Sequence, residues 1–284
     1  MTGNLWRSTL ILLATAACAG SRPSRPVSPS PAPTQPSAEV SDNGPWIFAY
    51  TSDTIRLQIN RSAAIESQTD SGTHREISTN NTHEILALAV SADTVRYTAT
   101  IDTFSTASQG LISGTPPVNL PVQISGAIDS VTVAADSSAL EPCDAVQSSL
   151  KTDIRNVLIS FPRQLAPGMT WRDSTVRVSC YGTIPMRATI VRRFSVVGKT
   201  SFNGEAVVTI QRVDSITAQG AGRQQQHQMV IETIGSGTAT YFVSPELGRL
   251  LRLTTTQDLD FIIRASGRTN RMRETAKEEF NRVR

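Results

Sequence analysis

The chain has 284 residues, of which 39% are hydrophobic and 18% charged, and its formal net charge is +3. The basic residues are scattered along the sequence, which excludes the clustered charge of a nucleic-acid-binding surface. Beyond the N-terminus, no apolar run approaches the roughly 20 residues that a membrane-spanning helix needs. The composition is that of an ordinary globular domain with one sizeable core.

The N-terminus has the pattern of an export signal. Arg7 supplies a positive charge, and residues 10–17 form a short apolar stretch that ends in small residues. This stretch is too short to span a bilayer as a helix. Residues 1–17 are therefore predicted to be a signal peptide.

The residue that follows the signal peptide is Cys18. Ala16, Ala17 and Cys18 together resemble the bacterial lipobox, in which the cysteine is acylated after cleavage, although Thr15 stands where that pattern prefers leucine. The resemblance implies that lipidated Cys18 anchors the mature protein to a membrane of the bacterial cell envelope, and we favour the outer membrane. The alternative is an ordinary secretory signal in which Cys18 is incidental.

The number of cysteines supports the prediction that Cys18 is lipidated. An exported chain with three cysteines has one left over, and lipidation of Cys18 leaves the pair Cys143 and Cys180. The oxidising envelope favours a disulfide between these two. In the chain-entropy model, a loop of this length would contribute about 4 kcal/mol. Two buried thiols are the alternative.

A tether is predicted between the anchor and the domain. Residues 18–45 consist largely of proline, serine, alanine, threonine and arginine, with seven prolines between residues 21 and 45. Such a composition cannot bury a core and favours an extended, disordered linker.

Residues 46–284 are predicted to form a single antiparallel β-rich domain with one helix near 143–161. Apolar residues 146, 150, 154, 157, 158 and 161 share one helical face. Elsewhere the apolar residues alternate by two. Strands are predicted at 46–50, 55–59, 73–90, 95–101, 171–180, 184–197, 206–218, 228–233, 238–243, 250–256 and 259–265, with two shorter ones within 122–135.

Turn signals separate these strands. Asn203-Gly204 is the strongest hairpin signal in the chain, and residues 245–248 and 267–270 also read as turns. Gly235-Ser236-Gly237 is interpreted as a loop. The tail at 272–283 fits a helix or a closing strand, and the strand is favoured. The predicted fold class is thus mainly β: a large antiparallel sheet, as a meander or half-barrel, that packs one helix.

Little in the sequence points to catalysis. His74, His83 and His227 have no metal-site spacing, and no nucleophile or phosphate-binding motif occurs. Asp258 and Asp260 alternate with apolar residues, so they are predicted to face solvent. We therefore predict a protein that is not an enzyme and uses no cofactor or metal.

The order of lipobox, tether, meander, helix and hairpins is similar to that of a broad class of bacterial envelope lipoproteins of uncharacterised function. The motifs are Gly168-Met-Thr-Trp171 and Cys180-Tyr-Gly-Thr-Ile-Pro185. More loosely, the chain resembles the LolA/LppX-type half-barrel lipoproteins. That resemblance implies a curved antiparallel sheet around a helix and a capacity to hold lipid, but no motif carries over binding residues.

Two functions remain. The favoured one is a structural or protein-interaction module, whose partner would be an envelope protein and not nucleic acid. The alternative is a binding protein or carrier for an apolar ligand or lipid. Its candidate ligand-binding residues are Ile154, Leu158, Trp171 and Phe261.

Both functions place the helix against the inner side of the sheet, facing residues such as Val178, Ile190, Phe261 and Ile263. Trp171 either packs over the helix at the rim or stacks on a ligand. The arginines at 187, 192 and 193 are interpreted as scattered solvated residues, with a cavity mouth as the alternative.

Overall fold

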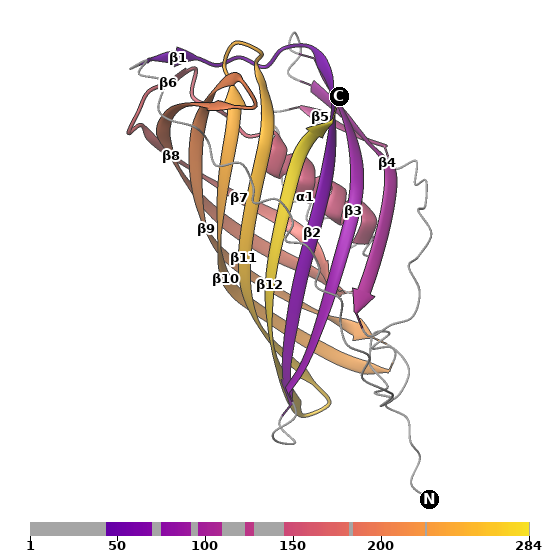
Figure 1. The fold of residues 1–284 in the computed structure, drawn as a ribbon. Coiled ribbons are helices and arrows are strands. Elements are labelled where there is room, and N and C mark those ends of the chain that lie inside the picture. The colour runs from indigo at the N-terminus through magenta and orange to yellow at the C-terminus, as the bar shows by residue number, and fades with distance from the viewer. Residues whose placement is uncertain are drawn as a thin grey trace, which may run out of the picture.

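The computed structural model describes residues 44–69, 75–91, 96–109, 123–127, 145–181, 184–224 and 226–283. The described chain is mainly β, and its large antiparallel sheet curls into a half-barrel around one helix (Figure 1). This is the fold class that the alternating pattern predicts. The segments predicted to be a signal peptide and most of a tether, with Cys18, lie outside the described residues.

The elements follow one another in this order: β1 (Trp46–Ile47), β2 (Asp53–Thr69), β3 (Arg75–Ser91), β4 (Arg96–Gln109), β5 (Gln123–Ala127), α1 (Ala145–Val157), β6 (Gln164–Leu165), β7 (Thr170–Tyr181), β8 (Ile184–Phe202), β9 (Glu205–Gln224), β10 (His227–Ser244), β11 (Arg249–Ala265) and β12 (Arg268–Val283). Ten of these strands form the large sheet, and β1 pairs with β6 in a small separate one.

Two meanders meet in the large sheet, whose strand order is β5-β4-β3-β2-β12-β11-β10-β9-β8-β7. Sequential strands pair antiparallel within each meander. The seam between the meanders joins β2, the first strand of the sheet in the sequence, to β12, the last. The favoured reading of the tail as a strand is confirmed, because β12 pairs with strands on both sides.

The predicted turns at Asn203-Gly204 and at residues 245–248 are confirmed, whereas the turn predicted at 267–270 is shorter and lies at Ser266 and Gly267, because β12 already begins at Arg268. Asn203 and Gly204 have φ angles of 51° and 81°, the left-handed conformation that a tight hairpin between β8 and β9 requires. Ser266 and Gly267, at 50° and 76°, turn β11 into β12. Asparagine and glycine tolerate the left-handed conformation better than other residues, and the dipeptide Asn203-Gly204 therefore predicts a hairpin turn.

Gly235-Ser236-Gly237 was predicted to be a loop, and this is wrong: the segment lies inside the continuous strand β10. Gly235 pairs with Ile216 on one side and Leu259 on the other. A Cβ atom at Gly235 would clash with the carbonyl oxygen of Asp258, so the glycine permits a close approach of two strands.

The helix is shorter than predicted, spanning Ala145–Val157 within the expected 143–161. Its apolar face is confirmed at Ile154, Val157 and Leu158, each at most 2% exposed. The Tyr50 hydroxyl donates to the Ile159 carbonyl oxygen at 2.8 Å and accepts from the Ile159 N–H at 3.1 Å. These two bonds fix the chain where it leaves the helix.

The buried apolar residues form two clusters. The first packs the end of α1 against inward residues of the sheet, including Leu57, Phe194, Tyr241 and Phe280. The second lies on β8, β10 and β11 and consists of Ile184, Met186, Ile231, Phe261 and Ile263. The described core is therefore divided in two.

Three of the residues expected to face the helix lie elsewhere. Val178 is 48% exposed, because the inward positions of β7 are the odd-numbered residues such as Thr175. Phe261 and Ile263 are buried, but they belong to the second cluster and not to the one that α1 packs against. Ile190 is buried at the cavity described below.

Candidate functional site

Charged side chains occupy inward positions of the sheet where apolar residues would be expected. Along β9, Val208, Ile210, Arg212, Asp214 and Ile216 alternate on the buried face. The side chains of Arg212 and Asp214 are only 5% and 8% exposed. Burial of charge is costly unless each group finds partners, so this part of the sheet requires a polar network.

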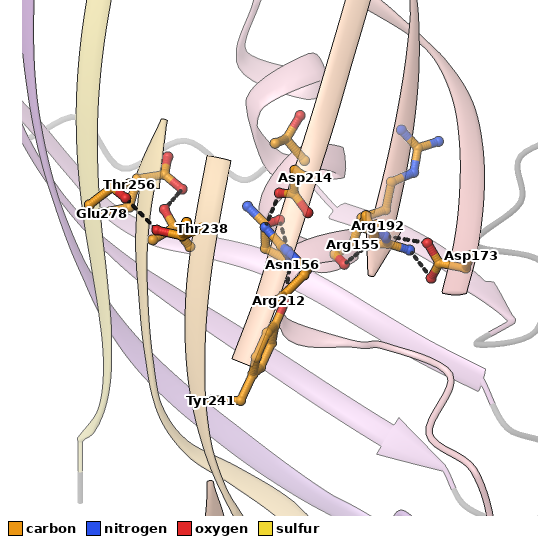
Figure 2. A network of polar contacts seen from close by, with 12 residues as sticks. Arg155, Asn156, Asp173, Arg192, Arg212, Asp214, Thr238, Tyr241, Thr256 and Glu278 are labelled. Carbon is orange, nitrogen blue, oxygen red and sulfur yellow. Dashed lines mark hydrogen bonds and ion pairs between the residues drawn. The ribbon is translucent and has the colours of Figure 1, made fainter. Parts of the chain in front are cut away.

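We call that network, part of which is drawn in Figure 2, the polar belt. It crosses the concave face between the two apolar clusters. The polar belt comprises Arg61, Asp173, Arg192, Arg212, Asp214 and Glu278 on the sheet and Asp153, Arg155 and Asn156 on α1.

Strand register aligns the members on the sheet. Asp173 lies opposite Arg192, which in turn lies opposite Asp214. Glu278 lies opposite Arg61 at the seam of the two meanders. Directly opposed residues of unlike charge attract each other across strands. The alternation of acid and base therefore follows from the pairing of the strands.

Arg192 links the sheet to the helix. Its Nε and Nη2 donate to the two carboxylate oxygens of Asp173, each at 2.7 Å, in a bidentate pair. Its Nη1 donates to the carbonyl oxygen of Arg155 at 3.1 Å. This carbonyl lies in the last turn of α1, where no backbone N–H follows to bind it and the helix dipole favours a cation.

Arg212 occupies the centre of the polar belt (Figure 2). Its Nη2 lies 2.9 Å from an oxygen of Asp214. Its Nη1 donates to the Asn156 side-chain oxygen at 3.2 Å and also to the Tyr241 hydroxyl. Arg212 thereby joins β9, β10 and the helix.

Arg61 provides the third link, at the seam. Its Nη2 pairs with Asp153 of the helix, and its Nε lies 2.9 Å from a carboxylate oxygen of Glu278. The Thr255 hydroxyl donates to the other oxygen of Glu278 at 3.1 Å. Three arginines from β2, β8 and β9 thus attach the polar side of α1 to the sheet.

A small cavity of about 50 Å³ lies beside these links. It is lined by Thr152, Arg155, Asn156, Thr175, Arg177, Ile190, Arg192, Arg212, Asp214, Ile216, Thr255, Thr256, Gln257 and Glu278. All but two of these side chains are polar. The cavity is therefore suited to a polar occupant, in contrast to the apolar lining typical of a lipid pocket.

Burial shapes the electrostatics of the cavity. Burial and the nearby Arg155 lower the pKa of Arg177 to about 10, so Arg177 still carries its charge at neutral pH. Burial raises the pKa of Asp214, although Arg212 opposes this. Burial would lower the pKa of Arg212, but Tyr241 and Asp214 outweigh it and the pKa is raised.

The four predicted ligand-binding residues do not meet at one site. Ile154 and Leu158 belong to the first apolar cluster, and Trp171 packs against that cluster. The Trp171 ring stacks on Phe194 at 4.8 Å between centroids and 4° between planes. Phe261 lies in the second cluster. None of the four lines the cavity.

The structure describes only one of the two cysteines of the predicted disulfide. Cys180 is half-buried near the end of β7, whereas Cys143 lies outside the described residues.

Of the other residues considered in the sequence, His74 also lies outside the described residues. His227 hydrogen-bonds Ser266 through Nδ1 at 2.7 Å beside the β11–β12 turn. Asp258 and Asp260 are exposed, as their alternation predicted.

The interpretation of the three arginines on β8 as solvated is wrong for Arg192 and right for its neighbours. Arg187 and Arg193 are exposed, but Arg192 is 6% exposed in the polar belt. The alternation of the strand could have indicated that Arg192 is buried, because its side chain lies on the same face as those of Ile190 and Phe194. The burial of Arg212 and Asp214 was also not predicted, although they alternate along β9 on the same face as Ile210 and Ile216.

Within the described ranges, no group of three or more histidine, cysteine or acidic residues could hold a metal ion. In that same part of the chain, no helix is long and apolar enough to cross a membrane.

Comparisons with known proteins find little. No protein-family model and no curated protein matches the sequence. One similar solved chain, described by the words "asymmetric conductivity of engineered proteins", is 6% identical over 80% of this chain and 100% of its own, with a TM-score of 0.23. A mutant of the Rh. blastica porin is 8% identical over 79% of this chain and 99% of its own, with a TM-score of 0.22. Likeness at this level carries no argument about function.

Proposed function

We propose that the protein is a membrane-tethered lipoprotein of the bacterial cell envelope. In this proposal, the β-rich domain acts without catalysis, as a structural or protein-interaction module. The N-terminal pattern supports the tether, because an acylated Cys18 followed by a proline-rich linker would hold the domain away from the membrane surface.

The observation that carries the interaction role is the packed interior beside the helix. An apolar carrier needs an internal space lined by apolar side chains. Here the inward residues Ile154, Val157 and Leu158 pack at 0–2% exposure against the sheet. The cavity next to them is small and lined mainly by polar side chains. Both features favour a module that acts through its outer surface.

Replacement of Cys18 tests the tether. The Cys18→Ala chain is expected to leave the membrane fraction or to stall before processing, because its acyl chains supply the membrane affinity. Fractionation after a high-salt wash, followed by intact mass of the processed chain, measures this. Ser21→Ala is the matched control and should stay in the membrane fraction. If Cys18→Ala pellets with membranes as the control does, the protein is not a lipoprotein.

Replacement of Ile154 tests the interior. In a solid core, Ile154→Ala is expected to lower the free energy of unfolding by about 2–5 kcal/mol. The exposed Ile234, at 63%, provides the control: Ile234→Ala should change it by no more than about 0.5 kcal/mol. Denaturant unfolding of delipidated protein gives both values. A cost for Ile154→Ala well below about 2 kcal/mol would mean a hollow interior and favour the carrier of an apolar ligand.

A further inference from the structure

The cavity between α1 and the sheet is bordered by more positive than negative charge. Four described arginines line it, namely Arg155, Arg177, Arg192 and Arg212, and Arg61 lies beside it through its ion pair with Asp153. Four described carboxylates accompany them: Asp153, Asp173, Asp214 and Glu278. Among the described residues, the cluster therefore has an excess of one positive charge.

Arg177 is not part of an ion pair among the described residues. Arg61, Arg192 and Arg212 each pair with a carboxylate at 4.0 Å or less. Arg177 instead donates from Nη1 to the Thr152 hydroxyl at 3.0 Å, and its buried Nε has no acceptor among the described residues. Buried polar groups in proteins usually have a hydrogen-bond partner, so this Nε marks a place for an acceptor.

The position of Arg177 in the fold suits a ligand site. It stands at an inward position of the edge strand β7, across from the polar face of α1. Thr152, Thr175 and Gln257 line the same cavity and add neutral hydrogen-bonding groups. The loss of solvation that lowers the pKa of Arg177 to about 10 leaves it charged at neutral pH. A bound anion would restore the interaction that burial removes.

We propose that this cavity binds one small oxyanion, either inorganic phosphate or a short carboxylate, with Arg177 as its main ligand. The planar guanidinium presents parallel N–H donors that match two oxygens of either ion. One negative charge balances the excess of the described cluster. The volume of about 50 Å³ is on the scale of one small ion. This site goes beyond the proposed module function and does not depend on the lipid anchor.

Thermal unfolding of the full chain in detergent tests the site. The midpoint is followed while sodium phosphate or sodium acetate replaces sodium chloride at constant ionic strength. A ligand that binds only the folded state raises the midpoint in a saturable manner. We expect such a rise with at least one of the two oxyanions. No saturable rise with either ion would overturn the proposal, as would a rise produced only by phosphatidylglycerol added to the detergent micelles.

Variants locate the effect. Arg177→Met is expected to weaken binding at least about tenfold, the usual scale for loss of a hydrogen bond to a charged group. Arg193→Met removes the same charge from the exposed face of the neighbouring strand and should bind as the wild type does. If Arg177→Met does not fold, Arg177→Lys keeps the charge without the planar donors and should still bind more weakly. Equal binding by the Arg177 and Arg193 variants would refute the site.

Discussion

At the scale of single residues, Glu274 shows the cost of ionising a carboxyl on the inner face. It lies on β12 between Leu259 of β11 and Ile65 of β2. Burial raises the pKa of Glu274, and the like charge of Glu278, four residues further along the same strand, adds to this. The folded state therefore binds the proton more tightly than the unfolded chain, in which a glutamate has a pKa of about 4.3.

This difference predicts how stability depends on pH. The contribution of protonated Glu274 is fully present below about pH 4 and is lost as the pH rises through the higher folded pKa. Glu274→Gln is accordingly expected to match the wild type near pH 3.5 and to unfold at higher urea concentration at pH 7. Asp260→Asn, on the exposed face, should show no such growing difference. A Glu274→Gln chain less stable than wild type at pH 7 would contradict the prediction.

At the scale of elements, the contact of α1 with β7 bears on the cysteines. The structure packs α1 against this edge strand, where Arg177 donates to Thr152. Cys180 lies one residue before the end of β7, and Cys143 precedes the start of α1 by two residues in the sequence. A disulfide between them would fasten the helix start to the sheet edge.

Mass measurement decides whether the bond forms. In the oxidised native protein, alkylation under denaturing conditions is expected to modify neither Cys143 nor Cys180, and reduction beforehand should expose two thiols. Tryptic mapping should then place both labels on these residues, since Cys18 is expected to be acylated. Two thiols that alkylate without reduction would show that the pair is unbonded.

Strands were predictable where local chemistry is unambiguous. Alternation located β7 to β9, and Asn203-Gly204 placed the hairpin because few other dipeptides adopt its backbone angles so readily. Gly235 misled because glycine signals a turn when read alone, and only the neighbouring strand explains it as a close approach. The tail was ambiguous because spacings of four satisfy both a helix and a strand.

At the scale of the whole molecule, the polar belt depends on register, which local sequence does not reveal. If the hairpin at Asn203-Gly204 continued without interruption, Arg192 would lie opposite Ser215. A bulge between Val196 and Gly198 shifts the pairing by one, so that Arg192 lies opposite Asp214. The alternation of the strands could have assigned the charged residues to the inner face, but it could not have predicted which of them lie opposite each other.

The seam between β2 and β12 has a consequence for how the protein is made. It pairs Arg56 with Val283, so the two meanders join through residues from nearly opposite ends of the described chain. The seam cannot begin to close until translation has reached the final strand, whatever the earlier hairpins have done. Contacts so distant in sequence are characteristic of slow folding. While the chain emerges, the strand β2 therefore has one unpaired border until β12 has been synthesised and covers it.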